Sequence, residues 1–87
     1  VSQIRRAVVS ITSNLAEGFS RNSYKEKSQF YSIALGSLTE IQSQLFIAKD
    51  INYISKEKFD SITAQTIIVS KLINGLIKST RSIIHNP

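Results

Sequence analysis

Three stripes of apolar residues, each with the three-and-four spacing of an amphipathic helix, run along this chain of 87 residues. The first stripe lies between about Ser2 and Ala16. It consists of Ile4, Val8, Ile11 and Leu15. Because glycine readily adopts the left-handed conformation that ends many helices, Gly18 predicts the end of this helix. Next along the chain, Ser23 and Glu26 have the spacing of a capping box, which predicts the start of a second helix.

The second and third stripes are longer than the first. The second consists of Tyr31, Ala34, Leu38, Ile41, Leu45 and Ala48. Residues 50–54 interrupt the pattern, and Ser55 is a suitable N-cap for the next helix. The third stripe consists of Phe59, Ile62, Thr66, Val69, Ile73, Leu76, Thr80 and Ile83. Its alternation of three and four over more than three heptads is typical of the seam of a helical bundle.

This pattern predicts an all-α protein, an antiparallel up-and-down helical bundle with three helices in a single domain over residues 1–87. At 1.5 Å per residue the second and third helices are about 40 and 45 Å long and the first only about 22 Å, so one wall of the bundle is open. Ile67 and Ile68 lie opposite the third seam, and Leu72, Ile77 and Ile84 flank it. We therefore expect self-association, with Ile67 and Ile68 in the oligomer interface, or a further segment that completes the core.

Gly36 lies inside the second helical pattern and Gly75 inside the third. Glycine within a helix costs about 0.5–1 kcal/mol relative to alanine, so each position needs a compensating reason. Since Ser37 beside Gly36 is also small, we interpret both glycines as points where another helix approaches closely.

Composition changes the picture in two ways. The chain has no cysteine and no apolar run long enough for a membrane span, which indicates the reducing cytoplasm and no membrane partner. Eleven Lys and Arg against six Asp and Glu give a net charge of +5, which favours an anionic partner such as RNA or DNA.

The sequence contains few residues or motifs that are typical of a catalytic site. The single histidine, His85, lies in the C-terminal tail, no Glu-x-x-His motif is present, and the three glycines are isolated, so we expect no enzyme, no metal site and no cofactor. Glu40 lies near the edge of the second stripe and needs a cation such as Arg5, Arg6 or Arg21. Asn14 and Glu17 are candidates for a structural polar cluster with Arg21 around Gly18. Together with Glu40 they form the predicted polar set.

Basic residues gather in two places that are suitable for contact with phosphates. The candidate nucleic-acid-binding residues are Arg5, Arg6, Arg21, Lys25, Lys27, Lys71, Lys78 and Arg81. Lys71 and Lys78 share one heptad position, and no acid follows Asp60. The alternative interpretation is an ordinary solvated surface. Tyr24 or Tyr31 offers a stacking surface for a base, although core packing suits Tyr31 better.

Three segments together resemble one protein family. They are Ser2-Gln3-Ile4-Arg5-Arg6-Ala7, Ser13-Asn14-Leu15-Ala16-Glu17-Gly18-Phe19-Ser20-Arg21 and Gly36-Ser37-Leu38-Thr39-Glu40, with Phe30 and Ala34-Leu35 between the last two. Over residues 2–54 the chain resembles the four-helix-bundle proteins encoded in 23S ribosomal RNA intervening sequences. Their relatives include the accessory variability protein of diversity-generating retroelements. One departure is Thr12, where the family usually has proline.

The resemblance carries expectations beyond the residue pattern. It implies four helices in the complete fold, with a further helix ahead of Ser2, and self-association into a ring, typically a pentamer. It also implies association with RNA or DNA as an accessory to a nucleoprotein assembly, with a protein partner such as a reverse transcriptase. The alternative function is a structural oligomerisation or protein-interaction module that binds no nucleic acid.

Overall fold

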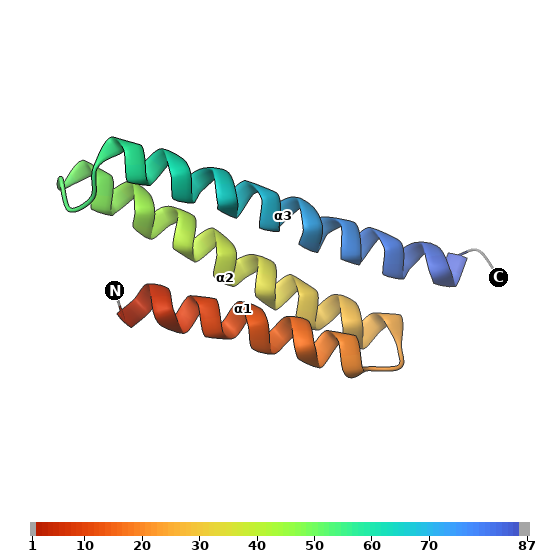
Figure 1. Ribbon diagram of the computed structural model, residues 1–87. Coiled ribbons are helices and arrows are strands. Elements are labelled where there is room, and N and C mark those ends of the chain that lie inside the picture. Colours follow the sequence, from red (N-terminus) through yellow and green to blue (C-terminus); the bar gives the residue numbers. More distant parts are fainter. Residues whose placement is uncertain (1, 86–87) are drawn as a thin grey trace.

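The computed structural model describes residues 2–85, with side chains for residues 3–81, and consists of three antiparallel helices in one layer (Figure 1). They are α1 (Ser2–Ser20), α2 (Tyr24–Asp50) and α3 (Lys56–His85). The central helix α2 packs against both others, whereas no Cα atom of α1 lies within 8 Å of one in α3 over the described range. The prediction of an all-α helical fold is confirmed. The layer measures 51 × 21 × 13 Å, so one long side of the core has no helix over it.

Both expected serine caps are present. The Ser23 side chain accepts a hydrogen bond from the Glu26 amide at 3.2 Å, and Ser55 accepts one from the Lys58 amide at 3.1 Å. Each bond satisfies an amide in the first helical turn that has no partner within the helix. Between the two helices Asn52 has a φ of 60°, in the left-handed region that asparagine tolerates better than most residues. This residue turns the chain back for the antiparallel packing of α3 on α2.

The predicted end of the first helix at Gly18 is wrong, because α1 continues to Ser20 and Gly18 does not have a positive φ. Two contacts explain the extension. The ring of Tyr31 covers Gly18 so closely that a Cβ atom there would lie 2.5 Å from Tyr31 Cε1. The Lys27 ammonium donates to the carbonyls of Gly18 and Phe19 at 3.1 Å each, which satisfies acceptors in the last turn. Gly18 is therefore needed for a close approach and not for a left-handed cap.

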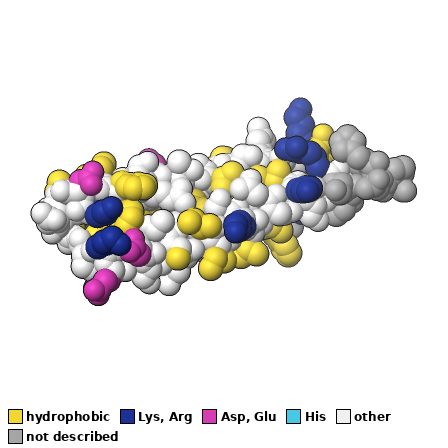
Figure 2. Space-filling view, turned by 90° about the horizontal axis from the view of Figure 1, so that it is seen from above, with side chains coloured by type: hydrophobic (Ala, Val, Ile, Leu, Met, Phe, Trp, Pro, Cys, Tyr) yellow, Lys and Arg dark blue, Asp and Glu magenta, His cyan; other side chains and the backbone are white. Residues whose placement is uncertain are grey.

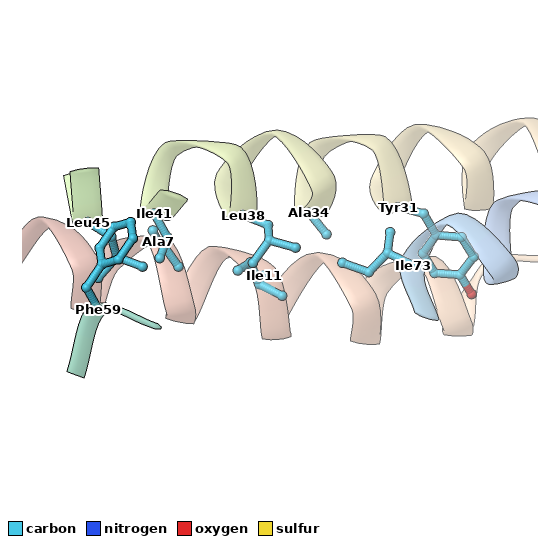
Figure 3. Close-up of a cluster of buried hydrophobic side chains, with 9 residues drawn as sticks. All are labelled: Ala7, Ile11, Tyr31, Ala34, Leu38, Ile41, Leu45, Phe59 and Ile73. Atoms are coloured by element: carbon cyan, nitrogen blue, oxygen red, sulfur yellow. The ribbon is translucent and has the colours of Figure 1, made fainter. Parts of the chain in front are cut away.

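The core is a row of buried side chains along the axis of α2 (Figure 3). It consists of Ala7, Ile11, Tyr31, Ala34, Leu38, Ile41, Leu45, Phe59 and Ile73. The predicted α2 stripe is thus confirmed from Tyr31 to Leu45, whereas Ala48 is only partly buried. On α1 the predicted Ile11 is buried together with Ala7, whereas the predicted Val8 is 47% exposed, because α1 turns the Ala7 side of its apolar face toward α2. On α3 Thr66 and Thr80 are buried with Phe59 and Ile73, as the seam predicted.

An apolar trough runs between α1 and α3 over the floor formed by α2. It holds a hollow of about 270 Å³, lined by Ile4, Val8, Ile11, Thr12, Leu38, Ile41, Ile62, Gln65, Thr66 and Val69. Ile62, predicted as a seam residue, is partly exposed because it faces this trough instead of a helix. Ile67, Ile68 and Leu72 are exposed on α3, as expected from their positions off the seam. The side chains of Ile83, Ile84 and His85 lie outside the described residues.

Candidate nucleic-acid interface

Charge is distributed unevenly along the long axis. The antiparallel fold brings the α1–α2 turn beside the C-terminal half of α3, and we call this part of the molecule the basic end. It contains six of the eleven cations and two of the six acids: Arg21, Lys25, Lys27, Lys71, Lys78 and Arg81 with Glu17 and Glu26. Figure 2 shows basic side chains with no acidic neighbours at the right of the molecule, and basic and acidic side chains mixed at the left. Most of the net charge of +5 therefore belongs to one end.

The three cations on α3 are the best placed for contact with phosphates. Lys71, Lys78 and Arg81 are all exposed, and none forms an ion pair with another described residue. Lys71 and Lys78 are two helical turns apart, about 10 Å along the axis, and Arg81 adds about one further turn. Such a row meets successive phosphates of an extended strand without contacting base edges.

The cations of the α1–α2 turn are partly engaged within the protein. The Arg21 guanidinium contacts Glu17 at 3.1 Å and Glu26 at 3.9 Å, and it lies 5.1 Å from the centre of the Phe30 ring. Lys27 is held by the two carbonyls at the end of α1. Lys25 is exposed and forms no ion pair over residues 3–81, so it is the most accessible of the three.

Arg5 and Arg6 lie near the other end of α1, so the structure does not bring them to the basic end. Arg6 lines a polar groove of about 460 Å³ between α1 and α2, together with Gln3, Ala7, Ser10, Ser37, Glu40 and Gln44. Glu40 is exposed and forms no ion pair within residues 3–81, so the expected pairing with an arginine is absent there.

Asn14 contacts Ser10, a residue of the polar groove, and does not join the Gly18 region. Its amide donates to the Ser10 carbonyl at 2.7 Å and to the Ser10 hydroxyl at 3.2 Å, and that hydroxyl contacts the Ser37 hydroxyl at 2.8 Å. The predicted polar set is therefore divided. Glu17 contacts Arg21 near the turn, whereas Asn14 joins α1 to α2 through Ser10.

The two glycines within α2 and α3 do not mark close contacts inside the chain. A Cβ atom at Gly36 or Gly75 would have no heavy atom within 4 Å among the described residues, apart from its own helical surroundings. The interpretation of close helix approach is wrong for the fold of the single chain. The close approach occurs at Gly18, where Tyr31 covers the helix.

The sequence pattern assigned no role to Phe19, and the structure places this residue at the basic end with its ring 74% exposed. Its ring lies 5.8 Å from the Lys27 ammonium and borders a pocket that Tyr24 also lines. Tyr31 is only 2% exposed, so its predicted core position is confirmed and a free stacking surface is excluded. The spacing of apolar residues could have identified Phe19, because a helix that continues past Gly18 places Phe19 on the same face as Leu15 and Val8.

Other classes of site have little support in the described part of the chain. Over residues 3–81 no three His, Asp or Glu side chains are grouped closely enough to hold a metal ion. Among the helices over residues 2–85, none has the length and apolar character needed to cross a membrane.

Comparison with known proteins supports the resemblance seen in the motifs. No match to the chain was found among the curated proteins compared. A sequence model of the 23S rRNA-intervening sequence proteins matches residues 1–75, which include α1, α2 and most of α3. On this match the chain belongs to the family of 23S rRNA-intervening sequence proteins.

Proposed function

We propose that this protein binds RNA through its basic end and has no catalytic activity of its own. The observation that carries the proposal is the uneven charge, with six cations and only two acids where the α1–α2 turn lies beside α3. The name of the family refers to ribosomal RNA, which makes RNA the first nucleic acid to test. Binding by Lys71, Lys78 and Arg81 neutralises phosphates and releases counterions, so it is tolerant of sequence and sensitive to salt.

The proposal includes self-association into a ring and an accessory role in a larger nucleoprotein assembly. A ring repeats the basic end around an axis, so that individually weak phosphate contacts add through multivalency. Ile67, Ile68 and Leu72 support self-association, because each is exposed on α3 although it is apolar. In this proposal the chain is also related to the accessory variability protein of diversity-generating retroelements, and the partner protein is an enzyme that acts on nucleic acid, such as a reverse transcriptase.

The same exposed side chains support a second candidate function. A protein that exposes several large apolar side chains on α3 is suited to act as an oligomerisation or protein-interaction module without nucleic acid. The two functions differ in one measurable property. Only the first requires affinity for RNA that depends on the charges of the basic end.

Two double variants on the same helix provide the test. Lys71→Gln/Lys78→Gln removes two charges at the basic end, whereas Lys56→Gln/Lys58→Gln removes two charges from the opposite end of α3. All four side chains are exposed, so neither variant disturbs the core. Binding of a single-stranded RNA is measured by fluorescence anisotropy between about 50 and 200 mM salt, a range over which phosphate contacts weaken strongly.

The basic-end variant should bind more weakly, and the slope of log affinity against log salt should decrease by up to about 1.4, since about 0.7 counterions are released per contact with a single strand and two contacts are lost. The control variant should keep the slope of the parent. If the parent protein binds no RNA at about 50 mM salt, or if both variants lose affinity equally, the interaction-module function replaces the proposal.

A further inference from the structure

The basic end contains a small pocket that phosphate contacts do not explain. It has a volume of about 280 Å³ and is lined by Phe19, Asn22, Tyr24, Lys27, Tyr31, Leu76, Ser79 and Thr80. The lining residues come from all three helices and from the α1–α2 turn. Pockets for drug-sized molecules have volumes of roughly 300–1,000 Å³, so this pocket suits a smaller group of one or two rings.

The pocket combines aromatic walls with a polar edge. Phe19 and Tyr24 contribute rings on the side of α1 and α2, and Leu76 contributes an apolar surface from α3. Asn22 and Ser79 add an amide and a hydroxyl, which donate and accept hydrogen bonds. This is the composition of a site that stacks on a planar group and contacts its polar edge.

The backbone that carries the Phe19 ring is held in place although the side chain is largely exposed. The Lys27 ammonium donates to the carbonyl of Phe19 itself and to that of Gly18, which fixes the last turn of α1 that carries the ring. Phe19 is the most exposed large apolar side chain over residues 3–81. An exposed ring on a fixed backbone is accessible to a ligand, and binding then costs less conformational entropy than it would on a mobile segment.

We propose that this pocket binds an unpaired base of single-stranded RNA, stacked on Phe19, while the phosphates on either side contact the cations of the basic end. The inference rests on the RNA binding proposed above and adds the form of RNA that is recognised. Charge complementarity favours this occupant, because Lys27 lines the pocket at the end of the molecule that carries most of the net charge, and a nucleotide is an anionic ligand that carries a planar ring. In a duplex the bases are stacked on one another and are not free to enter such a pocket.

Phe19→Ala tests the stacking, and Tyr53→Ala is its matched control. Tyr53 is 70% exposed, much like Phe19 at 74%, but it lies in the α2–α3 loop at the opposite end. The probes are a uridine decamer and an RNA duplex of the same length. Stacking on an aromatic side chain accounts for about a five-fold to 150-fold change in affinity per base. Phe19→Ala should therefore weaken binding of the decamer by a factor in this range, with an unchanged salt slope and an unchanged affinity for the duplex.

A second variant gives a direct signal from the pocket. The chain contains no tryptophan, so Phe19→Trp introduces a single fluorescent indole. Its emission should be quenched by the decamer and not by the duplex, because only an unpaired base stacks on the ring. Tyr53→Trp, which places the indole at the opposite end, should show no quenching.

The outcomes separate this inference from the proposed function. If the parent binds RNA but Phe19→Ala has the affinity of the parent, or weakens duplex and decamer equally, the pocket is not a base site and the phosphate contacts remain. If the parent binds neither probe, both proposals are wrong. If Phe19→Ala instead lowers the mass of the protein in light scattering, the ring packs against a second copy of the chain and the base site is overturned.

Discussion

The contact between Gly18 and Tyr31 makes the sharpest prediction about stability. An alanine at Gly18 would place its Cβ atom 2.5 Å from Cε1 and 2.9 Å from Cδ1 of the Tyr31 ring. Both distances are well below van der Waals contact. Tyr31 is only 2% exposed and belongs to the core row, so its ring cannot move away from Gly18 without disturbing the packing around it.

Two effects of opposite sign decide the outcome of Gly18→Ala. Alanine is favoured over glycine by up to about 1 kcal/mol inside a helix, and by less in the last turn, where Gly18 lies. Overpacking of a filled core costs about 1–3 kcal/mol. The overpacking term is larger, so we expect Gly18→Ala to lower the free energy of unfolding by roughly 0.5–2 kcal/mol.

Gly36→Ala is the matched control, because the same atom is added where no heavy atom lies within 4 Å. Only the helix term operates at Gly36, so this variant should be more stable than the parent by about 0.5–1 kcal/mol. Thermal unfolding followed by circular dichroism at one protein concentration should place the two variants on opposite sides of the parent. A difference of about 1 kcal/mol corresponds to roughly 4–8 °C in a domain of this size. If Gly18→Ala melts at or above the parent temperature, the ring is not confined as the packing indicates.

Three further predictions concern the packing of α3 and its surface. The Thr66 hydroxyl accepts a hydrogen bond from the Gln42 amide at 3.1 Å in the α2–α3 seam, where Thr66 is buried. Thr66→Val should therefore lower the free energy of unfolding, measured by urea denaturation, by about 0.5–1.5 kcal/mol. An unchanged urea midpoint would contradict this role. Ile68 is 59% exposed on α3. If α3 forms the interface between subunits, Ile68→Lys should lower the mass measured by light scattering at micromolar concentration. An unchanged mass would exclude Ile68 from that interface. The pKa of Lys56 is raised above the usual lysine value because its ammonium donates to Asp60 at 2.9 Å and is attracted by that carboxylate. The small stabilisation is therefore present at neutral pH and lost as the pH rises through the raised pKa, and NMR titration of Asp60→Asn should show the pKa of Lys56 returning toward the usual value.

The three helices could be predicted because their signals are local. The stripe from Tyr31 to Leu45 has the helical period, and the serines at positions 23 and 55 have the spacing at which a side chain reaches a helix amide. The end of α1 could not be predicted in this way. It depends on Lys27 and Tyr31, which follow Gly18 by nine and thirteen residues and reach it only after α2 has folded back.

The side of a helix that packs was harder to predict than the helix itself. Ile4, Ala7, Val8 and Ile11 form an apolar face on α1 that is wider than one neighbouring helix covers. The sequence favoured the larger Val8 as the contact, but α2 packs on Ala7, and Val8 faces the trough because α3 does not reach α1. The spacing along a helix therefore shows that a face is apolar, whereas the position of the neighbouring helices decides which part of it is buried.

The cations of the candidate interface were predictable as a set, but their surroundings were not. Arg21 was identified from its position beside Gly18, yet its carboxylate partners and the nearby Phe30 ring depend on the turn between α1 and α2. Phe19 was overlooked for the same reason, since its helix was expected to end at Gly18, just before it. The error in the predicted end of α1 therefore left Phe19, which borders the pocket, out of the predicted site.

The electrostatic character of the basic end follows from the apolar pattern. Lys25 and Lys78 are separated by more than fifty residues in sequence, and no local rule connects them. The stripes on α2 and α3 pack these helices together, and the short loop between them makes them antiparallel. This packing brings the acid-free half of α3 next to the start of α2, which carries Lys25. A substitution that changed the register of the seam, at Phe59 or Ile73 for example, would therefore alter the charge distribution without changing any charged residue. In this fold the hydrophobic pattern determines where the charges meet, and the proposed RNA contacts depend on it as much as on the lysines themselves.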